Sequence, residues 1–429
     1  MRQGTSSFTR VPLGRERNFV RRALVLVVDG WGAGFVGCYG NSWLDTPALD
    51  QWACQSVLFE QCQSECPDPL ILYPHLFDGS HPLAPVAVDG PLAILADADI
   101  PVHLLSDDPR LLQLRETTRL TSVETFPEVA DVAADSAEET TLARFAGVLL
   151  DWLEEPAREE VIWAHARGML GPWDAPYSYR ENLADEDDPA PPEVVHPPFE
   201  RENRKFDADY ALGFTQAYAG QVTVLDMLLG ELLATIEELP IDEQPLVVLT
   251  STGGYPLGLH GQIGREDDAP VRLYSDTLHV PLLIRQPGGK EGLSRCQGIA
   301  RLADVLPTVV ESFGLPMSGR EGVDLLGVRL SESREHLLCG LGDQRYFRTH
   351  DWSLRYHLPN EETPLEALEL DQIVVELFVK PDDRWEVNNV ADRCKNIAEI
   401  GLRTALAIEQ AYRDDQPCPE IPEELRTPA

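Results

Sequence analysis

The sequence contains no apolar run that approaches the ~20 residues needed for a membrane-spanning helix. It also lacks the features of a secretion signal near its start. Residues 1–22 are basic and lead into only six apolar residues before Asp29, without the apolar core and cleavage site of a signal peptide. No internal repeat or low-complexity tract is present. We therefore expect a cytoplasmic globular protein that is not associated with a membrane.

A disulfide framework and an excess of basic residues are also missing. Eight cysteines are scattered along the chain, and the group Cys54, Cys62 and Cys66 lacks the paired spacing of a structural zinc site. We expect reduced and mostly buried thiols. The chain has 35 Lys and Arg against 72 Asp and Glu, a net charge of −37. A field of this sign repels phosphate backbones, so we do not expect nucleic acid among the partners.

The residues that are present follow an α/β pattern. At 429 residues the chain is long enough for one large domain and a smaller appendage. Short apolar runs alternate with helix-length segments, which predicts a mainly parallel sheet covered by helices. We expect strands at 23–28, 92–95, 102–105, 161–164, 246–250 and 280–284, and helices opening at Thr46-Pro47 and covering 140–154, 207–239 and 299–313.

The composition also predicts how the chain is divided. We expect an N-terminal extension (1–22), an α/β domain (23–330), a small C-terminal subdomain of short strands and a final helix at 397–412 (331–413), and a tail (414–429). Residues 171–205 are rich in Pro, Asp and Glu, which is typical of a long surface loop. Three aromatic residues in this loop, Trp173, Tyr177 and Tyr179, either cover a pocket or pin the loop to the body of the protein.

Five sequence blocks occur in an order that points to a known family. The blocks are Leu24–Asp50 (with LVLVVDG, GCYGN and DTPALD), Val247–Gly261 (with VVLTSTGG and LGLHG), Leu273–Arg285, Leu302–Pro316 and Glu376–Asp392. Together they resemble the sulfatases of the alkaline-phosphatase superfamily. The resemblance implies a doubly wound, mainly parallel sheet with helices on both faces, and a small C-terminal α+β subdomain. It also implies that any chemistry lies at the carboxyl ends of the strands.

The metal ligands that this resemblance implies are mostly replaced. Such sulfatases hold a divalent cation such as calcium, which needs several oxygen ligands. They provide two Asp after the first strand, and an Asp with an adjacent Asn or His after a later strand. Here Asp29-Gly30 keeps one carboxylate, and Ser251-Thr252-Gly253-Gly254 keeps neither of the later donors. Asp29 is therefore the only remaining ligand of the family set, and we expect no cofactor.

The nucleophile that the resemblance implies is replaced as well. Family members carry Cys or Ser in a C/S-x-P-x-R motif. Counting from Phe59 or back from Gly79 places Pro69 at the nucleophile and Tyr73 at the motif Arg. Proline has no nucleophilic atom. Cys66 lies three positions away and lacks the motif's Pro and Arg, so it is either a packed thiol or a substitute nucleophile.

Other cleft residues are kept in part. Arg265 corresponds to a family Lys and would keep a positive charge that clamps an oxyanion. His260 and His279 follow predicted strands, and each is either a cleft residue or an ordinary loop histidine. The family's His in the middle strand region is replaced within 167–171. We therefore expect Asp29, His260 and Arg265 to be the cleft remnants.

A relocated metal site is the alternative that would preserve activity. His75, Asp78 and His81 fall in the segment that replaces the nucleophile helix, and with Asp29 they offer two imidazoles and two carboxylates for zinc. This spacing also arises by chance in polar loops.

The sequence thus predicts a pseudo-sulfatase that acts by binding or regulation. Two alternatives stay open: an active sulfate or phosphate ester hydrolase with a rewired metal site, and a structural subunit of a complex. The expected partner is a small anion or a protein.

Overall fold

The computed structural model describes residues 20–86, 90–127, 129–201, 206–265, 271–317, 322–327, 334–359, 365 and 368–426. Most of the predicted N-terminal extension, residues 202–205 of the predicted loop and the last three residues of the tail lie outside the described residues.

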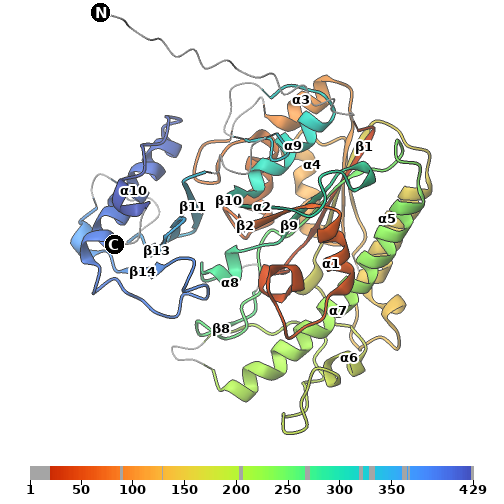
Figure 1. Ribbon diagram of the computed structural model, residues 1–429, viewed down its shortest axis with the longest axis horizontal. Coiled ribbons are helices and arrows are strands. Elements are labelled where there is room, and N and C mark those ends of the chain that lie inside the picture. Colours follow the sequence, from red (N-terminus) through yellow and green to blue (C-terminus); the bar gives the residue numbers. More distant parts are fainter. Residues whose placement is uncertain are drawn as a thin grey trace, which may run out of the picture.

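An eight-stranded sheet forms the centre of the molecule (Figure 1). Its strand order is β10-β2-β9-β7-β1-β5-β3-β4, and only β9 runs antiparallel to its neighbours. The strands are β1 (Arg22–Val28), β2 (Val57–Gln63), β3 (Val102–Ser106), β4 (Ser122–Thr125), β5 (Glu160–Ala166), β7 (Leu246–Thr250), β9 (Leu282–Arg285) and β10 (Ser294–Arg301). The predicted mainly parallel sheet is confirmed.

Helices cover both faces of this sheet, and β1 is accordingly apolar from Ala23 to Val28. Leu24, Leu26 and Val28 belong to one hydrophobic core, and the residues between them belong to a second core on the opposite face. Figure 1 shows the two helical layers. The first contains α1 (Pro47–Cys54), α5 (Thr141–Glu154) and α7 (Ala208–Glu238), and the second contains α2 (Pro69–Asp78), α3 (Pro91–Asp97), α4 (Leu114–Thr117) and α9 (Val305–Ser312).

Two expected elements are wrong. The strand expected at 92–95 is helix α3, because Pro91 at its first position favours a helix start and four apolar residues do not distinguish the two structures. The helix expected at 299–313 is split between β10, a 3₁₀ turn at 302–304 and α9. Asp304 marks the change, since its Oδ2 accepts a hydrogen bond from the Arg301 N–H at 3.1 Å.

The segment 171–205 is held more firmly than a surface loop. It contains α6 (Tyr177–Glu181) and β6 (Glu200–Arg201), which pairs with β8 (Gln262–Ile263). Trp173 is fully buried, and its indole N–H donates to the Met169 carbonyl at 2.9 Å. The Tyr177 hydroxyl donates to the Pro191 carbonyl at 2.8 Å. Trp173 and Tyr177 therefore anchor this segment to the body of the protein, which is the second of the two roles expected for its aromatic residues.

Helix α7 confirms the helix expected at 207–239. By length and composition it is apolar enough to cross a bilayer. However, 67% of its most apolar window is buried inside the protein, where it packs against α1, α5 and α6. Its apolar character is therefore that of a helix inside the hydrophobic core.

A second, antiparallel sheet lies beside the first and forms the blue part of Figure 1. Its strands follow chain order: β11 (His336–Leu341), β12 (Gln344–Thr349), β13 (Trp352–His357) and β14 (Val375–Val379). Helix α10 (Lys395–Arg413) packs on this sheet through Leu402 and Ile408, which share a core with Leu338 and Leu354. The short strands and final helix expected at the C-terminal end are confirmed.

All eight cysteines are free thiols. Four are buried and three are half-buried, and Cys54 is exposed, so the expectation of mostly buried thiols holds for half of them.

Candidate functional site

Asp29 lies where the resemblance places the chemistry, directly after the central strand β1. The register of β1 against β5 and β7 brings the three strand ends together. The Asp29 side chain is 1% exposed. Its Oδ1 accepts hydrogen bonds from the Gly30 N–H at 2.9 Å and the Thr252 hydroxyl at 2.5 Å.

The third partner of Asp29 is a guanidinium. Arg265 Nη1 lies 3.3 Å from Asp29 Oδ1 in an ion pair, and both side chains are buried, at 8% and 1% exposure. The same guanidinium donates to the carbonyls of Gly254, at 3.4 Å, and of Pro67. A cation supplied by the chain itself therefore satisfies this carboxylate.

The backbone around this pair is crowded at the two positions where the resemblance implies further ligands. Gly30 has φ +76°, and a Cβ there would lie 2.9 Å from Met169 Cβ, so a second Asp after β1 would be strained and crowded. A Cβ on Gly253 would lie 2.9 Å from Pro67 Cβ and 3.0 Å from Arg265 Nη1. An Asn or His at that position would overlap the arginine.

The segment that would carry a nucleophile is a packed helix start. Pro69 begins α2, and the Asp68 side chain caps it by accepting from the Leu70 N–H at 2.9 Å. Tyr73 is fully buried, and its hydroxyl lies 2.6 Å from Nδ1 of His165. Burial raises the pKa of Tyr73 well above its usual value. These groups form an internal network without a reacting nucleophile.

Comparison with known proteins gives these positions their context. A family model described as Sulfatase matches residues 114–315. Human iduronate 2-sulfatase is 23% identical over 217 residues, which are 45% of this chain and 36% of that protein. Human arylsulfatase K is 28% identical over 100 residues, which are 23% of this chain and 18% of that protein.

Residues 114–315, a little under half of the chain, are therefore similar to the sulfatases. The aligned part spans well under half the length of these curated relatives. The fold agrees, because the phosphonate monoester hydrolase of Agrobacterium radiobacter superimposes with a TM-score of 0.68 at 16% identity, covering 90% of this chain and 94% of that one. A 2-O GAG sulfatase superimposes with a TM-score of 0.69 at 14% identity, covering 92% and 93%. The alkaline-phosphatase/sulfatase-like fold is thereby confirmed.

The divalent cation that this family implies does not fit the residues present. Hard cations need several oxygen ligands, and this centre offers one carboxylate, already shared by a guanidinium, a hydroxyl and an amide. Arg265 and Thr252 already contact this carboxylate, and Thr252 stands where the resemblance implies the later Asp. We therefore derive no chemical step through a metal ion at Asp29.

The other predicted cleft residues do not join Asp29. His260 is stacked on Tyr274 with ring centres 3.7 Å apart, and its Nε2 bonds the Trp385 carbonyl at 3.0 Å. His279 Nε2 bonds the Glu60 carbonyl at 2.8 Å. Of the three expected cleft remnants, the structure brings together Asp29 and Arg265 and leaves out His260.

Cys66 is a packed thiol and does not have the properties of a substitute nucleophile. It is fully buried, and burial raises its pKa to about 12, so it carries its proton at neutral pH. The reactive form of cysteine is the thiolate, which this environment disfavours.

The relocated metal site is not assembled either. His81 is buried, stacked on Tyr412 at 4.0 Å, and bonded through Nε2 to the Leu338 carbonyl at 2.8 Å. Its Nδ1 accepts from the Leu83 N–H at 3.1 Å, so both nitrogens are used. His75 Nδ1 bonds the Ser80 hydroxyl at 2.7 Å. Within the part of the chain that the structure describes, no group of three His, Cys, Asp or Glu side chains is arranged to hold a metal ion.

Glu65 gives this region a pH dependence that can be measured. Glu65 is fully buried, and its Oε1 lies 3.5 Å from Nε of Arg301 in an ion pair. Neither carboxylate oxygen has a hydrogen bond within the described residues. Burial raises its pKa from 4.5 to about 7. The folded protein favours the protonated carboxyl, so the stabilisation is complete at pH values below the pKa of the unfolded chain. It is lost as the pH rises through the higher pKa of the folded protein. The free energy of unfolding of the native protein should therefore fall by up to about 3 kcal/mol between about pH 5 and pH 8.

The variant Glu65→Gln should remove this part of the pH dependence, because the amide stays neutral. Urea unfolding at several pH values measures it, with the exposed Glu399→Gln as a matched control. Equal pH dependence in native protein and Glu65→Gln would contradict the assignment.

Proposed function

We propose that this chain is a pseudo-sulfatase, which keeps the family fold but acts by binding instead of metal-dependent ester hydrolysis. The observation that carries the proposal is the buried ion pair between Asp29 and Arg265 in place of a bound cation. The crowding at Gly30 and Gly253 supports it, since these positions admit no further ligands without a shift of the backbone or of Arg265. Pro69 removes the nucleophile independently of the metal site.

The relatives indicate which ligands to consider. Three are named sulfatases and one a phosphonate monoester hydrolase, so their substrates carry tetrahedral oxyanions. We propose that this chain has kept an affinity for organic anions of this kind. A rewired hydrolase is the less favoured alternative, because both nitrogens of His81 are already bonded.

Metal content and turnover test the proposal together. We expect elemental mass spectrometry of chelator-free protein to show no stoichiometric metal, and aryl sulfates and phosphates to remain intact. A sulfatase with a complete ligand set, purified in the same way, is the positive control. A stoichiometric ion that disappears in Asp29→Ala, together with turnover, would overturn the proposal. Turnover lost in His75→Ala or His81→Ala would favour the rewired hydrolase.

A further inference from the structure

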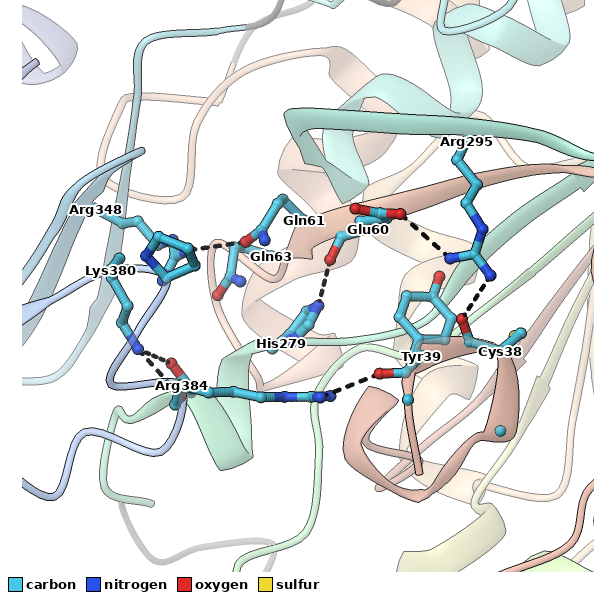
Figure 2. Close-up of a pocket in the computed structure, with 14 residues that line it drawn as sticks. Cys38, Tyr39, Glu60, Gln61, Gln63, His279, Arg295, Arg348, Lys380 and Arg384 are labelled. Atoms are coloured by element: carbon cyan, nitrogen blue, oxygen red, sulfur yellow. Dashed lines mark hydrogen bonds and ion pairs between the residues drawn. The ribbon is translucent and has the colours of Figure 1, made fainter. Parts of the chain in front are cut away.

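A polar cavity of about 450 Å³ lies between the main sheet and the C-terminal sheet (Figure 2). Neither Asp29 nor Arg265 lines it. Figure 2 shows Arg348, Lys380 and Arg384 entering from the C-terminal side, with Arg295 of β10 on the opposite side. Its volume is in the range that accommodates a small organic ligand. In a chain with a net charge of −37, a cavity lined by four basic side chains is unexpected.

Two of these four cations are neutralised by the chain. Arg295 lies 3.2 Å from a Glu60 oxygen in an ion pair. Lys380 lies 2.9 Å from a Glu386 oxygen, and both side chains are buried. Glu60 and Glu386 thus balance the charges of Arg295 and Lys380. The charges of Arg348 and Arg384 remain to be explained.

Arg348 and Arg384 make no ion pair with any of the described residues. Arg348 is 5% exposed, donates to Gln61 Oε1 at 2.7 Å, and has no hydrogen-bond partner for its Nε among them. Arg384 donates to the Tyr39 carbonyl at 3.1 Å and lies over the Trp385 ring at 5.0 Å. Burial lowers the pKa of Arg384. A cation removed from water without a counter-charge is costly, and a bound anion would offset that cost.

His279, which lies in the same cavity, contributes no charge. Burial and the nearby Arg348, Arg384 and Lys380 lower its pKa to about 3, so the imidazole is neutral at physiological pH. The cavity therefore keeps the positive charge of Arg348 and Arg384 and adds no pH-sensitive charge from the histidine.

A second cavity, of about 330 Å³, adjoins the first. The two share Ser275, His279 and Arg384 in their walls. The rest of the second cavity is mainly aromatic and aliphatic, lined by Phe35, Tyr218, Tyr255, Leu257, Leu259, Trp385 and Val387. Asp276 also lines it, and burial raises the pKa of this carboxyl. Arg384 thus lies at the boundary between a cationic and an apolar compartment.

We propose that these adjoining cavities bind one amphiphilic organic anion. Its sulfate- or phosphate-type head group contacts Arg348 and Arg384, and its apolar body lies in the aromatic compartment. Planar guanidinium groups suit this head group because they donate two parallel hydrogen bonds to an oxyanion. The inference deepens the proposed binding function and rests on it, while placing the ligand outside the remnant of the sulfatase centre.

Naphthalene-2-sulfonate is a suitable probe because a sulfonate is not an ester, so its binding is independent of any turnover. We expect calorimetry at constant ionic strength to show tighter binding than for inorganic sulfate or 2-naphthol, which represent one half of the ligand each. Arg384→Gln should weaken binding by about tenfold or more, the value of one charge-assisted hydrogen bond. The double variant Arg348→Gln/Arg384→Gln should abolish it.

The exposed Arg119→Gln changes the net charge equally and should bind as the native chain does. Arg384 is half-buried, so its variant is expected to fold even where Arg348→Gln does not. No binding of the sulfonate, or equal affinity in Arg384→Gln, would overturn the inference. Equal affinity for inorganic sulfate would overturn the role of the apolar compartment. Detectable ester turnover would overturn the pseudo-enzyme proposal and leave this binding result unaffected.

Discussion

Replacing Arg265 with methionine is expected to lower the free energy of unfolding by about 3–5 kcal/mol, because it leaves a buried carboxylate without its counter-charge. Among the described residues, Asp29 would keep only the Thr252 hydroxyl and the Gly30 amide as hydrogen-bond donors. Chemical denaturation monitored by circular dichroism measures the loss. The exposed Arg119→Met is the matched control for the removal of an arginine.

A second variant separates the charge effect from the loss of packing. Asp29→Asn/Arg265→Met removes both charges, and we expect it to recover most of the stability, since the penalty lies in the unpaired charge. Added calcium should not rescue Arg265→Met, because a single carboxylate is a poor ligand set for this ion. A loss no larger than in the control, or rescue by calcium, would contradict the view that Arg265 replaces the cation.

The sequence was a good guide to the sheet and a partial guide to the helices. Continuous valine-rich runs such as 23–28 and 246–250 are typical of buried strands, and they lie where expected. Residues 92–95 are also continuously apolar but contain no valine, and Pro91 before them favours a helix start. The boundary inside 299–313 depends on the contact between Asp304 and Arg301, which no periodicity reveals.

The candidate site was predictable only where a family motif marks it. Motif positions indicated replacements at Gly30, Pro69 and Tyr73, and the structure brings together two of the expected cleft residues, Asp29 and Arg265. The motif could not show that Arg265 forms an ion pair with Asp29, because this contact depends on how separate loops pack together.

The cationic cavity gave no signal at all in the sequence. Arg295, Arg348 and Arg384 come from β10, β12 and the segment after β14, and none of them belongs to a motif assigned to chemistry. Only the packing of the C-terminal sheet beside the main sheet brings their charges together. Sites formed between sheets in this way are therefore missed by motif reading.

The variant Glu386→Gln is expected to cost about 3–5 kcal/mol, because it leaves Lys380 buried without a counter-charge. The Glu386 carboxylate is fully buried and accepts from Lys380 at 2.9 Å and from Ser275, Tyr346 and Ser353 at 2.8–2.9 Å. Ser275 begins α8 (Ser275–Leu278), and the others belong to the C-terminal sheet or the segment after it. This carboxylate thus ties that sheet to the rest of the chain.

The stabilisation that Glu386 provides depends on pH with the opposite sign to that of Glu65. Burial opposes the ionisation of Glu386, but Lys380 and the hydrogen bonds hold its pKa below the usual 4.5. Its stabilisation is present above that value and is lost as the pH falls through the lower, folded pKa. Hydrogen exchange of Glu386→Gln should show faster opening of β12 and β13 than of β1. Lys380→Met/Glu386→Gln should restore much of the protection, whereas uniform exchange across both sheets would mean that Glu386 does not join them.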